Sequence, residues 1–582
     1  MAQQNRTKEI WLIPKRVNLH QTICLIDGIL ERGYDGTTWN PQKQNNLGVN
    51  LKNWGATKNG KNISSQAIRT LVASIPQYLG FAYINTEKTP NTICLTNAGV
   101  ALWEKHKDDL VKVPNLVLGK DFLITESDAV LHQMEKLQIT NPIINKDCEN
   151  IYVFPFRFML KVLLEVKYLD QEEIAYFLFK VRNEDEVDLI VQEILNFRKL
   201  STENREKIIR AFKVTYIGNI TLVKAPSSGY FMSLCKITGI IDKINVTPVN
   251  RAGSITAIKI KNSCLEYVNE MLNKKYKDIN IYDFRDNLKL WIDYIGCPDR
   301  DYPPVDMSII NKTNNAYFVQ VYKDKKCFYD DLIEGNMTLC CPMFLGELYS
   351  IKVFDVDTGE ELDNYDICPT IGNQEILIET KGYASKSKIE TLSNIGQDVI
   401  EHCQATQFAG KTLNYLTTLS KITGEDFVNR PALRGAYLEF FVYKMLNILK
   451  KNGVIDDVVW NGHIGKYGLP VAAPGGKKGT SDIVFIIDDL HIVVELTTIK
   501  AKSTQFNAEV ASAPDHIRLY KDDVDKDVVG VYCAPIMHER IVGTMKSTIA
   551  PYGIDLYCLT VNELVDILVS NNRGMIKKYF TT

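Results

Sequence analysis

In the first third of the chain, the hydrophobic and polar positions predict short helices followed by two-stranded segments. Residues 22–32 place apolar side chains at the spacing of an amphipathic helix. A second helix is predicted from the capping residues Ser64 and Ser65 to about residue 79. Residues 81–84 and 92–95 then flank an Asn/Thr/Lys/Pro tip, which is typical of a β-hairpin. Helices followed by such a wing indicate that residues 1–135 form a winged-helix-like DNA-recognition subdomain.

The same order of elements returns further along the chain. Residues 156–166 and 170–179 predict a helix pair, and the second helix opens with the capping-box pattern Asp170-x-x-Glu173. Residues 241–246 and 255–260 predict two strands, and the loop between them would be a second wing with Arg251 near its tip. We therefore expect residues 136–275 to form a second winged-helix-like DNA-recognition region. Breaker residues and short apolar strands in residues 276–379 indicate a linker region with small β-rich structure.

From about residue 380 the pattern changes to long helices and strands in one α/β arrangement. The predicted elements are 385–419, 433–449, 454–460, 482–497, 528–533, 554–559 and 561–569. Mixed strands with flanking helices predict one compact domain over residues 380–582. The fold class expected for the whole chain is multidomain α+β.

Composition narrows the class of protein. A chain of 582 residues, 45% hydrophobic and 24% charged, is ordinary for a globular protein of about three or four domains. The beginning of the sequence lacks the apolar core of a secretion signal, and no apolar run is long enough for a spanning helix. A cytoplasmic location is therefore expected. The thirteen cysteines include no C-x-x-C pair, which favours buried free thiols over zinc or disulfides.

The net charge of −2 does not indicate a nucleic-acid binder, but the charge is uneven. Residues 1–70 hold ten Lys and Arg residues against four Asp and Glu residues, which is compatible with contact to DNA. The candidate DNA-binding residues are Lys58, Lys61, Ser65, Gln66, Arg69 and Arg251. A solvated polar face or a protein-interaction module would show the same pattern, so these alternatives stay open.

Residues 481–497 carry the strongest chemical signal. Two β-branched apolar runs around a short acidic break predict a β-hairpin. Asp482 opens the first strand and Glu495 lies near the end of the second, so antiparallel pairing brings the two carboxylates side by side. Two carboxylates at the end of an apolar hairpin are suited to a hard divalent cation. The hairpin therefore points to phosphodiester chemistry.

Further side chains could join this pair. Glu439 lies on an apolar helix, where a carboxylate is costly unless it meets a partner or a metal. Glu509 and His516 follow the hairpin, seven residues apart. Each residue also has an ordinary interpretation as a helix-surface acid, a strand-end charge or a solvated pair. Their joint occurrence favours one acidic cluster.

Taken together, these motifs resemble a known nuclease family. The patterns Arg434-Gly435-x-x-x-Glu439, Pro474-Gly475, Asp482-x12-Glu495-x-Thr497 and Glu509-x6-His516 resemble the cleavage domain of the AlwI/PleI/MlyI group of type IIS restriction endonucleases. That group includes nicking endonucleases, and its cleavage domain belongs to the PD-(D/E)xK class. The motifs cover roughly residues 430–520, and the helix-plus-wing half agrees with the family's two-part recognition region.

The resemblance implies site residues and a cofactor. Asp482, Glu495 and Glu439 would hold Mg²⁺. The implied catalytic set is Glu439, Asp482, Glu495, Thr497, Glu509 and His516. The sequence departs from the wider class at Thr497, where a lysine is usual, so the charged group near the attacking water would be His516 or Lys500.

These inferences predict a Mg²⁺-dependent type IIS restriction or nicking endonuclease. It would bind a short asymmetric site in double-stranded DNA and hydrolyse a phosphodiester a few bases outside it. A double-strand break would require a second copy or a smaller nuclease subunit. The alternatives are a winged-helix DNA-binding regulator with a catalytically silent C-terminal domain, and a repair or transposon nuclease of the same class.

Overall fold

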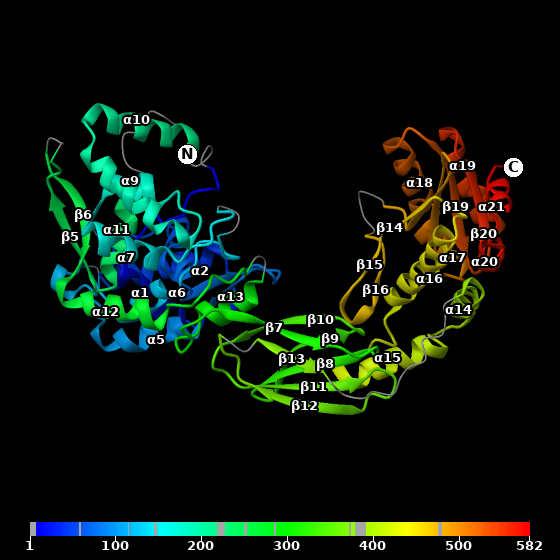
Figure 1. The fold of residues 1–582 in the computed structure, drawn as a ribbon, viewed down its shortest axis with the longest axis horizontal. Helices are drawn as coiled ribbons and strands as arrows, with labels where there is room; N and C mark the ends of the chain where they lie inside the picture. The colour runs from blue at the N-terminus through cyan, green and yellow to red at the C-terminus, as the bar shows by residue number, and fades with distance from the viewer. Residues whose placement is uncertain are drawn as a thin grey trace. The chain divides into compact units, whose positions relative to one another are not determined.

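The chain is a multidomain α+β protein built from two compact units (Figure 1). The computed structural model describes residues 7–57, 60–114, 116–144, 148–217, 227–249, 253–284, 287–371, 374–378, 391–474 and 480–581. The first unit comprises Met1–Val305 with Pro342–Leu345, and the second comprises Asp306–Cys341 with Gly346–Thr582. The finer division into four parts stays a prediction.

The first unit begins with helices and a small three-stranded sheet. The elements are α1 (Leu19–Glu31), β1 (Thr37–Thr38), α2 (Pro41–Asn53), α3 (Ser65–Val72), α4 (Ile75–Tyr78), β2 (Ala82–Asn85), β3 (Thr92–Leu95) and α5 (Asn97–His106). The sheet has the order β1-β3-β2. The hairpin lies where the sequence predicts it, whereas the long helix predicted to residue 79 is split into α3 and α4. Pro76 explains the split, because proline has no N–H for residue 72 and its ring clashes with that carbonyl.

The rest of the first unit is mainly helical. Its elements are α6 (Asp128–Lys136), α7 (Pro155–Val166), β4 (Leu169–Asp170), α8 (Gln171–Glu173), η4 (Ile174–Leu178), α9 (Val187–Lys199), α10 (Thr202–Phe212), η6 (Lys213–Ile217), α11 (Ser228–Ile237), β5 (Ile241–Val246), β6 (Ile255–Ile260), α12 (Leu265–Glu270), η8 (Met271–Lys275) and α13 (Leu288–Ile295). The sheet order is β4-β6-β5. The predicted capping box is present, since Asp170 accepts from Glu173 N at 2.9 Å and Glu173 accepts from Asp170 N at 3.0 Å.

A large hydrophobic core of this unit extends along the chain from Ile10 to α13, and a smaller one includes Leu25, Ile68 and Leu71. Trp291 and Tyr294 of α13 are buried in the large core, although they lie in the range that the sequence suggests is a linker. Their burial assigns this helix to the first unit.

The second unit begins with seven strands in two sheets. The strands are β7 (Pro304–Asn311), β8 (Tyr317–Lys323), β9 (Lys326–Ile333), β10 (Thr338–Phe344), β11 (Tyr349–Asp355), β12 (Glu361–Ile367) and β13 (Glu375–Ile378). The sheet orders are β10-β7-β13 and β12-β11-β8-β9. The division between the units falls inside β7 and β10, so these strands carry the chain from one unit to the other.

The remainder of the second unit is an α/β arrangement. Its elements are α14 (Leu392–Gln404), α15 (Gly410–Thr423), α16 (Pro431–Lys451), β14 (Asp457–Trp460), β15 (His463–Ile464), η9 (Lys466–Gly468), β16 (Pro470–Val471), β17 (Ile483–Ile487), β18 (Leu490–Leu496), α17 (Lys502–Glu509), α18 (Ser512–Asp523), β19 (Asp527–Ala534), α19 (Glu539–Ile549), β20 (Asp555–Thr560), α20 (Val561–Val569) and α21 (Arg573–Tyr579).

The sheet β14-β17-β18-β19-β20 positions the candidate site. The pairs β14/β17 and β17/β18 are antiparallel, and β18/β19 and β19/β20 are parallel. Alternate residues of β17 and β18 face two cores, as the period of a strand requires. One core packs against α14, α16 and α20, and the other against α18 and α19 (Figure 1). The sheet is therefore buried on both faces, and polar side chains gather at the strand ends.

Of the thirteen cysteines, six are buried. The prediction of buried thiols is wrong for Cys327, Cys340 and Cys368, which are exposed. Among the described residues, no helix combines the length and apolarity needed to cross a bilayer.

Candidate active site

Asp482 and Glu495 occupy neighbouring positions across the hairpin β17–β18. The register pairs Ile483 with Val494, so Asp482, which directly precedes β17, faces Glu495 in β18. The backbone N–H of Leu496 donates to Asp482 Oδ2 at 2.7 Å, which fixes the carboxylate against the second strand. Burial raises the pKa of Asp482 well above its usual range, and the charges of Glu495 and Glu439 raise it further. The hairpin thus holds a carboxyl that resists ionisation unless a cation is near.

Glu439 points inward from α16 and is only 5% exposed. Two donors meet at one of its oxygens, because Trp460 Nε1 and the N–H of Ala473 each lie 3.1 Å from Glu439 Oε2. Burial raises the pKa of Glu439, and the two hydrogen bonds lower it in part. This carboxylate is therefore buried and held in a defined orientation.

Glu509, at the end of α17, joins the same group. Burial raises the pKa of Glu509, whereas a hydrogen bond with Thr497 and the charge of His516 lower it. Thr497 is itself fixed, because its N–H donates to Cys533 O at 3.0 Å and its hydroxyl accepts from Ile499 N at 3.2 Å. Thr497 thus places its hydroxyl beside the Glu509 carboxylate.

His516 of α18 contacts the central carboxylate. Its Nδ1 lies 3.1 Å from Glu495 Oε2 and 3.3 Å from Oε1. Burial raises the pKa of Glu495 well above its usual range, and the charges of Glu509 and Glu439 raise it further. His516 is thus the imidazole in direct contact with the Glu495 carboxyl group.

The structure therefore brings together all six residues of the implied catalytic set. Glu439, Asp482, Glu495 and Glu509 act on one another electrostatically, and His516 and Thr497 lie against two of them. Among the described residues, no group of three or more His, Cys, Asp or Glu side chains is arranged as a ready-made metal site. A Mg²⁺ ion keeps several waters and needs only one or two protein carboxylates. The all-oxygen donor set fits that requirement.

Lys500, the other sequence candidate for the charged group, binds elsewhere. Its Nζ donates to Gln404 O at 2.7 Å, and to Ala405 O at 3.4 Å, at the end of α14. Arg434 of the family-like motif binds the same end, since its Nη2 lies 2.8 Å from Ala405 O. Both cations hold α14 in place, so of the two candidates His516 is the one that contacts the carboxylates.

Helix α3 of the first unit carries three candidate DNA contacts. Ser64 caps the helix by accepting from Ala67 N at 3.3 Å, and Ser65 is the first helical residue. Gln66 and Arg69 are exposed, and both line a groove of about 520 Å³ that also includes Lys15. Lys61 is exposed in the loop before the helix. Lys58 and Arg251 lie outside the described residues.

Sequence reasoning did not find the two donors to Glu439. Trp460 is 21 residues from Glu439 and Ala473 is 34 residues away, so no local spacing connects them. Trp460 itself was a usable signal. It ends a predicted strand, and an indole N–H that packs against the protein needs an acceptor.

The sequence matches the AlwI restriction endonuclease family over residues 77–292 and 355–566. No curated protein sequence gives a significant match. The small subunit of the heterodimeric restriction endonuclease R.BspD6I is a structural neighbour at 15% identity and a TM-score of 0.23, covering 32% of this chain and 86% of that one. Restriction endonuclease FokI is another at 10% identity and a TM-score of 0.24, covering 99% of both chains. With such TM-scores, neither neighbour defines a fold or a function for this chain. The family match extends over most of the sequence, and the chain therefore belongs to the AlwI restriction endonuclease family.

Proposed function

We propose that this restriction endonuclease is of type IIS: it binds a short asymmetric DNA site with its first unit and uses Mg²⁺ in its second unit to hydrolyse a phosphodiester outside that site. The observation that carries the proposal is the cluster of four carboxylates around the hairpin β17–β18, of which Glu439 and Glu495 are buried and Asp482 and Glu509 are half-buried. Burying carboxylates together is costly unless a cation offsets their charge. The cluster is therefore better explained as a cation site than as part of the core.

The surroundings of the cluster support a PD-(D/E)xK-type cleavage domain. A helix bearing an acid, α16, precedes a mixed sheet in which Asp482 directly precedes β17 and Glu495 lies in β18. Thr497 departs from the lysine of that class, and the contact of His516 with Glu495 offers a replacement cation.

The residues divide the chemistry among them. A bound Mg²⁺ would polarise a phosphoryl oxygen and lower the pKa of the attacking water. Asp482 and Glu495 would hold the ion, and Glu439 would complete its shell through its ordered carboxylate. His516 would neutralise charge at Glu495 and stay close to the water that loses its proton.

The first unit supports DNA recognition by a winged helix. The order α1-β1-α2-α3-α4-β2-β3 with the sheet β1-β3-β2 supports a winged-helix domain in which the short α4 precedes the wing. The side of α3 opposite its buried Ile68, Leu71 and Val72 exposes Gln66, Arg69, Thr70 and Ala73. A polar helix face at this spacing suits base contacts in a major groove. The hairpin β5–β6 gives a second wing.

Cleavage of a supercoiled plasmid tests the proposal. The wild-type chain should cut in Mg²⁺ and Asp482→Ala should not, while both bind the same DNA fragment in a gel shift. Run-off sequencing of the cut strands should give a fixed offset from one short motif. Because the proposal gives each chain one active site, at the hairpin β17–β18, one chain should cut one strand, and a double-strand break would need a second copy or a smaller subunit.

The alternative functions give different outcomes in the same experiment. Binding without cleavage in every sequence context would indicate a regulator with a silent C-terminal domain. Cuts that are scattered or that follow DNA structure would indicate a repair or transposon nuclease.

A further inference from the structure

Glu439 is oriented by the residue that precedes one chain segment and by the last residue of that segment. That segment, residues 461–473, is called the strap below and contains β15, η9 and β16. Trp460, directly before the strap, and Ala473, at its end, both donate to Glu439 Oε2 at 3.1 Å. The position of the carboxylate therefore depends on how the strap is held.

At its first end, the backbone of the strap packs closely against the Trp460 indole. The indole packs on α16, stacked on Tyr443 with ring centres 5.4 Å apart and beside Phe440 at 5.5 Å. The backbone at Gly462 passes so close to the ring that a Cβ there would lie 2.4–2.5 Å from three indole atoms. Any side chain at this position would therefore displace the donor to Glu439.

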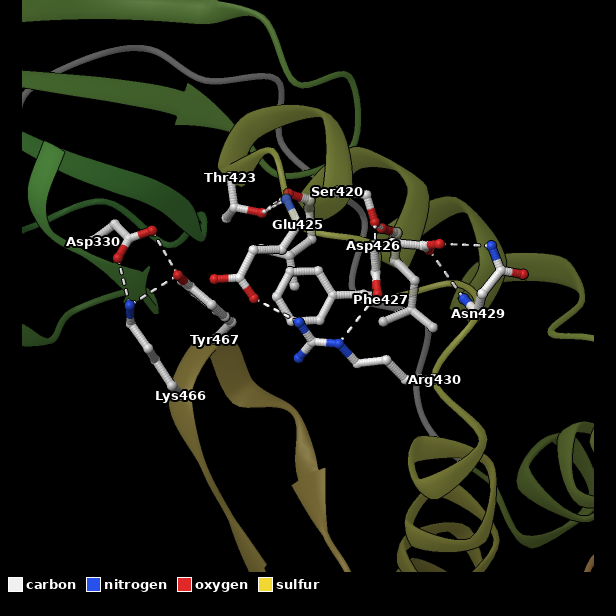
Figure 2. A network of polar contacts seen from close by, with 12 residues as sticks. Asp330, Ser420, Thr423, Glu425, Asp426, Phe427, Asn429, Arg430, Lys466 and Tyr467 are labelled. Carbon is white, nitrogen blue, oxygen red and sulfur yellow. Dashed lines mark hydrogen bonds and ion pairs between the residues drawn. The ribbon is translucent and has the colours of Figure 1, made fainter. Parts of the chain in front are cut away.

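At its tip, the strap is fixed to β9. Figure 2 shows Lys466 and Tyr467 directed toward Asp330. Tyr467 donates its hydroxyl to Asp330 Oδ2 at 2.5 Å and its N–H to Asp331 Oδ1 at 3.0 Å, and Lys466 forms an ion pair with Asp330. The hydroxyl of Tyr415, in α15, donates to Tyr467 O. These contacts hold Tyr467 at φ +59°, a left-handed conformation that costs a non-glycine residue about 1 kcal/mol or more.

A second set of contacts closes around the tip (Figure 2). The ring of Phe427 meets Tyr467 edge-on at 5.8 Å. Arg430 lies over Phe427 at 4.2 Å and donates to Glu425 Oε2 at 2.6 Å. The tip is thus enclosed by β9 on one side and by the segment after α15 on another.

We propose that the strap is a positioning device for Glu439, in which Trp460 is the positioning residue and the anchorage of Tyr467 on β9 sets where the strap lies. The inference rests on the proposed function, since it gives Glu439 its place at the metal. It extends that function to residues of the β-rich sheet that touch none of the reacting groups. The structure thus ties the carboxylate to a strand more than 100 residues earlier in the chain.

Three variants separate positioning from mere stability. Trp460→Phe keeps an aromatic ring, although a smaller one, and removes the N–H donor. Gly462→Ala keeps the donor and displaces it, and Asp330→Asn weakens the tip anchorage. We expect the first two to lower the single-turnover cleavage rate about 10- to 100-fold, because each disturbs one hydrogen bond to a buried carboxylate. The DNA concentration for half-saturation should stay unchanged, whereas the Mg²⁺ concentration for half-maximal rate should rise. Asp330→Asn should show the same pattern in weaker form.

Trp103→Phe is the matched control. Trp103 also donates its indole N–H to a carboxylate, Asp27 Oδ1 at 2.9 Å, but it lies in the first unit. This variant should leave the Mg²⁺ dependence of cleavage unchanged.

A spectroscopic measurement tests the proposal independently of cleavage activity. Of the six tryptophans, only Trp460 lies in the second unit, so its ¹⁹F resonance in 5-fluorotryptophan-labelled full-length protein can be assigned with Trp460→Phe. Mg²⁺ should shift that resonance, and Asp330→Asn should shift it without added metal. If Trp460→Phe reduces the yield of folded protein, Asp330→Asn carries the test.

The outcomes distinguish the two proposals. If Trp460→Phe and Gly462→Ala cut with wild-type rates and Mg²⁺ dependence while Asp482→Ala is inactive, the positioning role is wrong and the proposed function stands. If the wild type does not cut in Mg²⁺ and the Trp460 resonance does not shift when Mg²⁺ is added, the proposed function is wrong. The positioning role for Glu439 is then wrong as well.

Discussion

Replacement of Glu439 separates what its charge does from what its hydrogen bonds do. Glu439→Ala leaves two half-buried donors, Trp460 Nε1 and Ala473 N, without their acceptor. Each orphaned donor costs about 1–3 kcal/mol, and the release of a buried carboxylate with a raised pKa returns part of that cost. We expect a net loss of about 2–4 kcal/mol in the free energy of unfolding of the second unit. Glu439→Gln keeps an oxygen for both donors, so its unfolding free energy should stay within about 1 kcal/mol of the wild type.

The two variants should be equally poor enzymes. A carboxylate about 4–5 Å from a bound cation is worth about 3–4 kcal/mol for each unit of positive charge at an effective dielectric constant near 20, so its loss beside a divalent ion should lower the rate by at least about 100- to 1000-fold. Urea unfolding followed by circular dichroism, with proteolysis to identify the unit that unfolds, measures stability, and single-turnover plasmid nicking measures the rate. Two results would refute the reasoning: Glu439→Gln nicking at the wild-type rate, or Glu439→Ala being as stable as the wild type.

Three further predictions concern the acidic cluster and α3. Because the folded-state pKa values of Asp482 and Glu495 are raised, their protons stabilise the metal-free fold at low pH, and this contribution is lost as pH rises through the raised values. The increase in unfolding temperature given by Mg²⁺ should therefore grow with pH. In Asp482→Asn this increase should depend less on pH. An effect of Mg²⁺ that does not change with pH would contradict the cluster as the cation site. His516→Ala should lower the nicking rate about 10- to 100-fold with DNA binding intact, because it removes the imidazole beside Glu495; an equal loss of binding in a gel shift would contradict this role. Arg69→Ala should weaken DNA binding by about 1–3 kcal/mol and leave the Mg²⁺ dependence of nicking unchanged. Lys526→Ala, which removes a lysine of the second unit, is the control. If Arg69→Ala binds DNA as the wild type does, α3 is not the recognition helix.

Local patterns predicted the parts of the fold that depend on near neighbours. The hairpin that pairs Asp482 with Glu495 follows from two β-branched apolar runs around a short acidic break, and the strands β5 and β6 begin and end where the sequence indicates. The split of the helix after Val72 could also have been predicted, because proline at position 76 breaks a helix. The prediction of one long helix rested on the apolar spacing alone and did not use Pro76.

Contacts between distant segments set the remaining features. The burial of Trp291 in the core of the first unit depends on helices far away in sequence, so the composition around residue 290 suggested only a linker. Lys500 looked like a replacement for the class lysine because it follows the hairpin, yet α14 supplies carbonyls that hold it. The family resemblance named the acids of the site, but it gave no indication of the strap that orients Glu439.

The discontinuous second unit has a practical consequence for protein engineering. Its first segment, Asp306–Cys341, contains β9 with the two aspartates that anchor Tyr467. A cleavage module excised at about residue 380, where the α/β pattern begins, would leave that anchor behind. A transplantable module should instead start before β7, and fusions to foreign DNA-binding domains should be joined there. Nuclease fusions truncated later are expected to keep their acids and lose their efficiency.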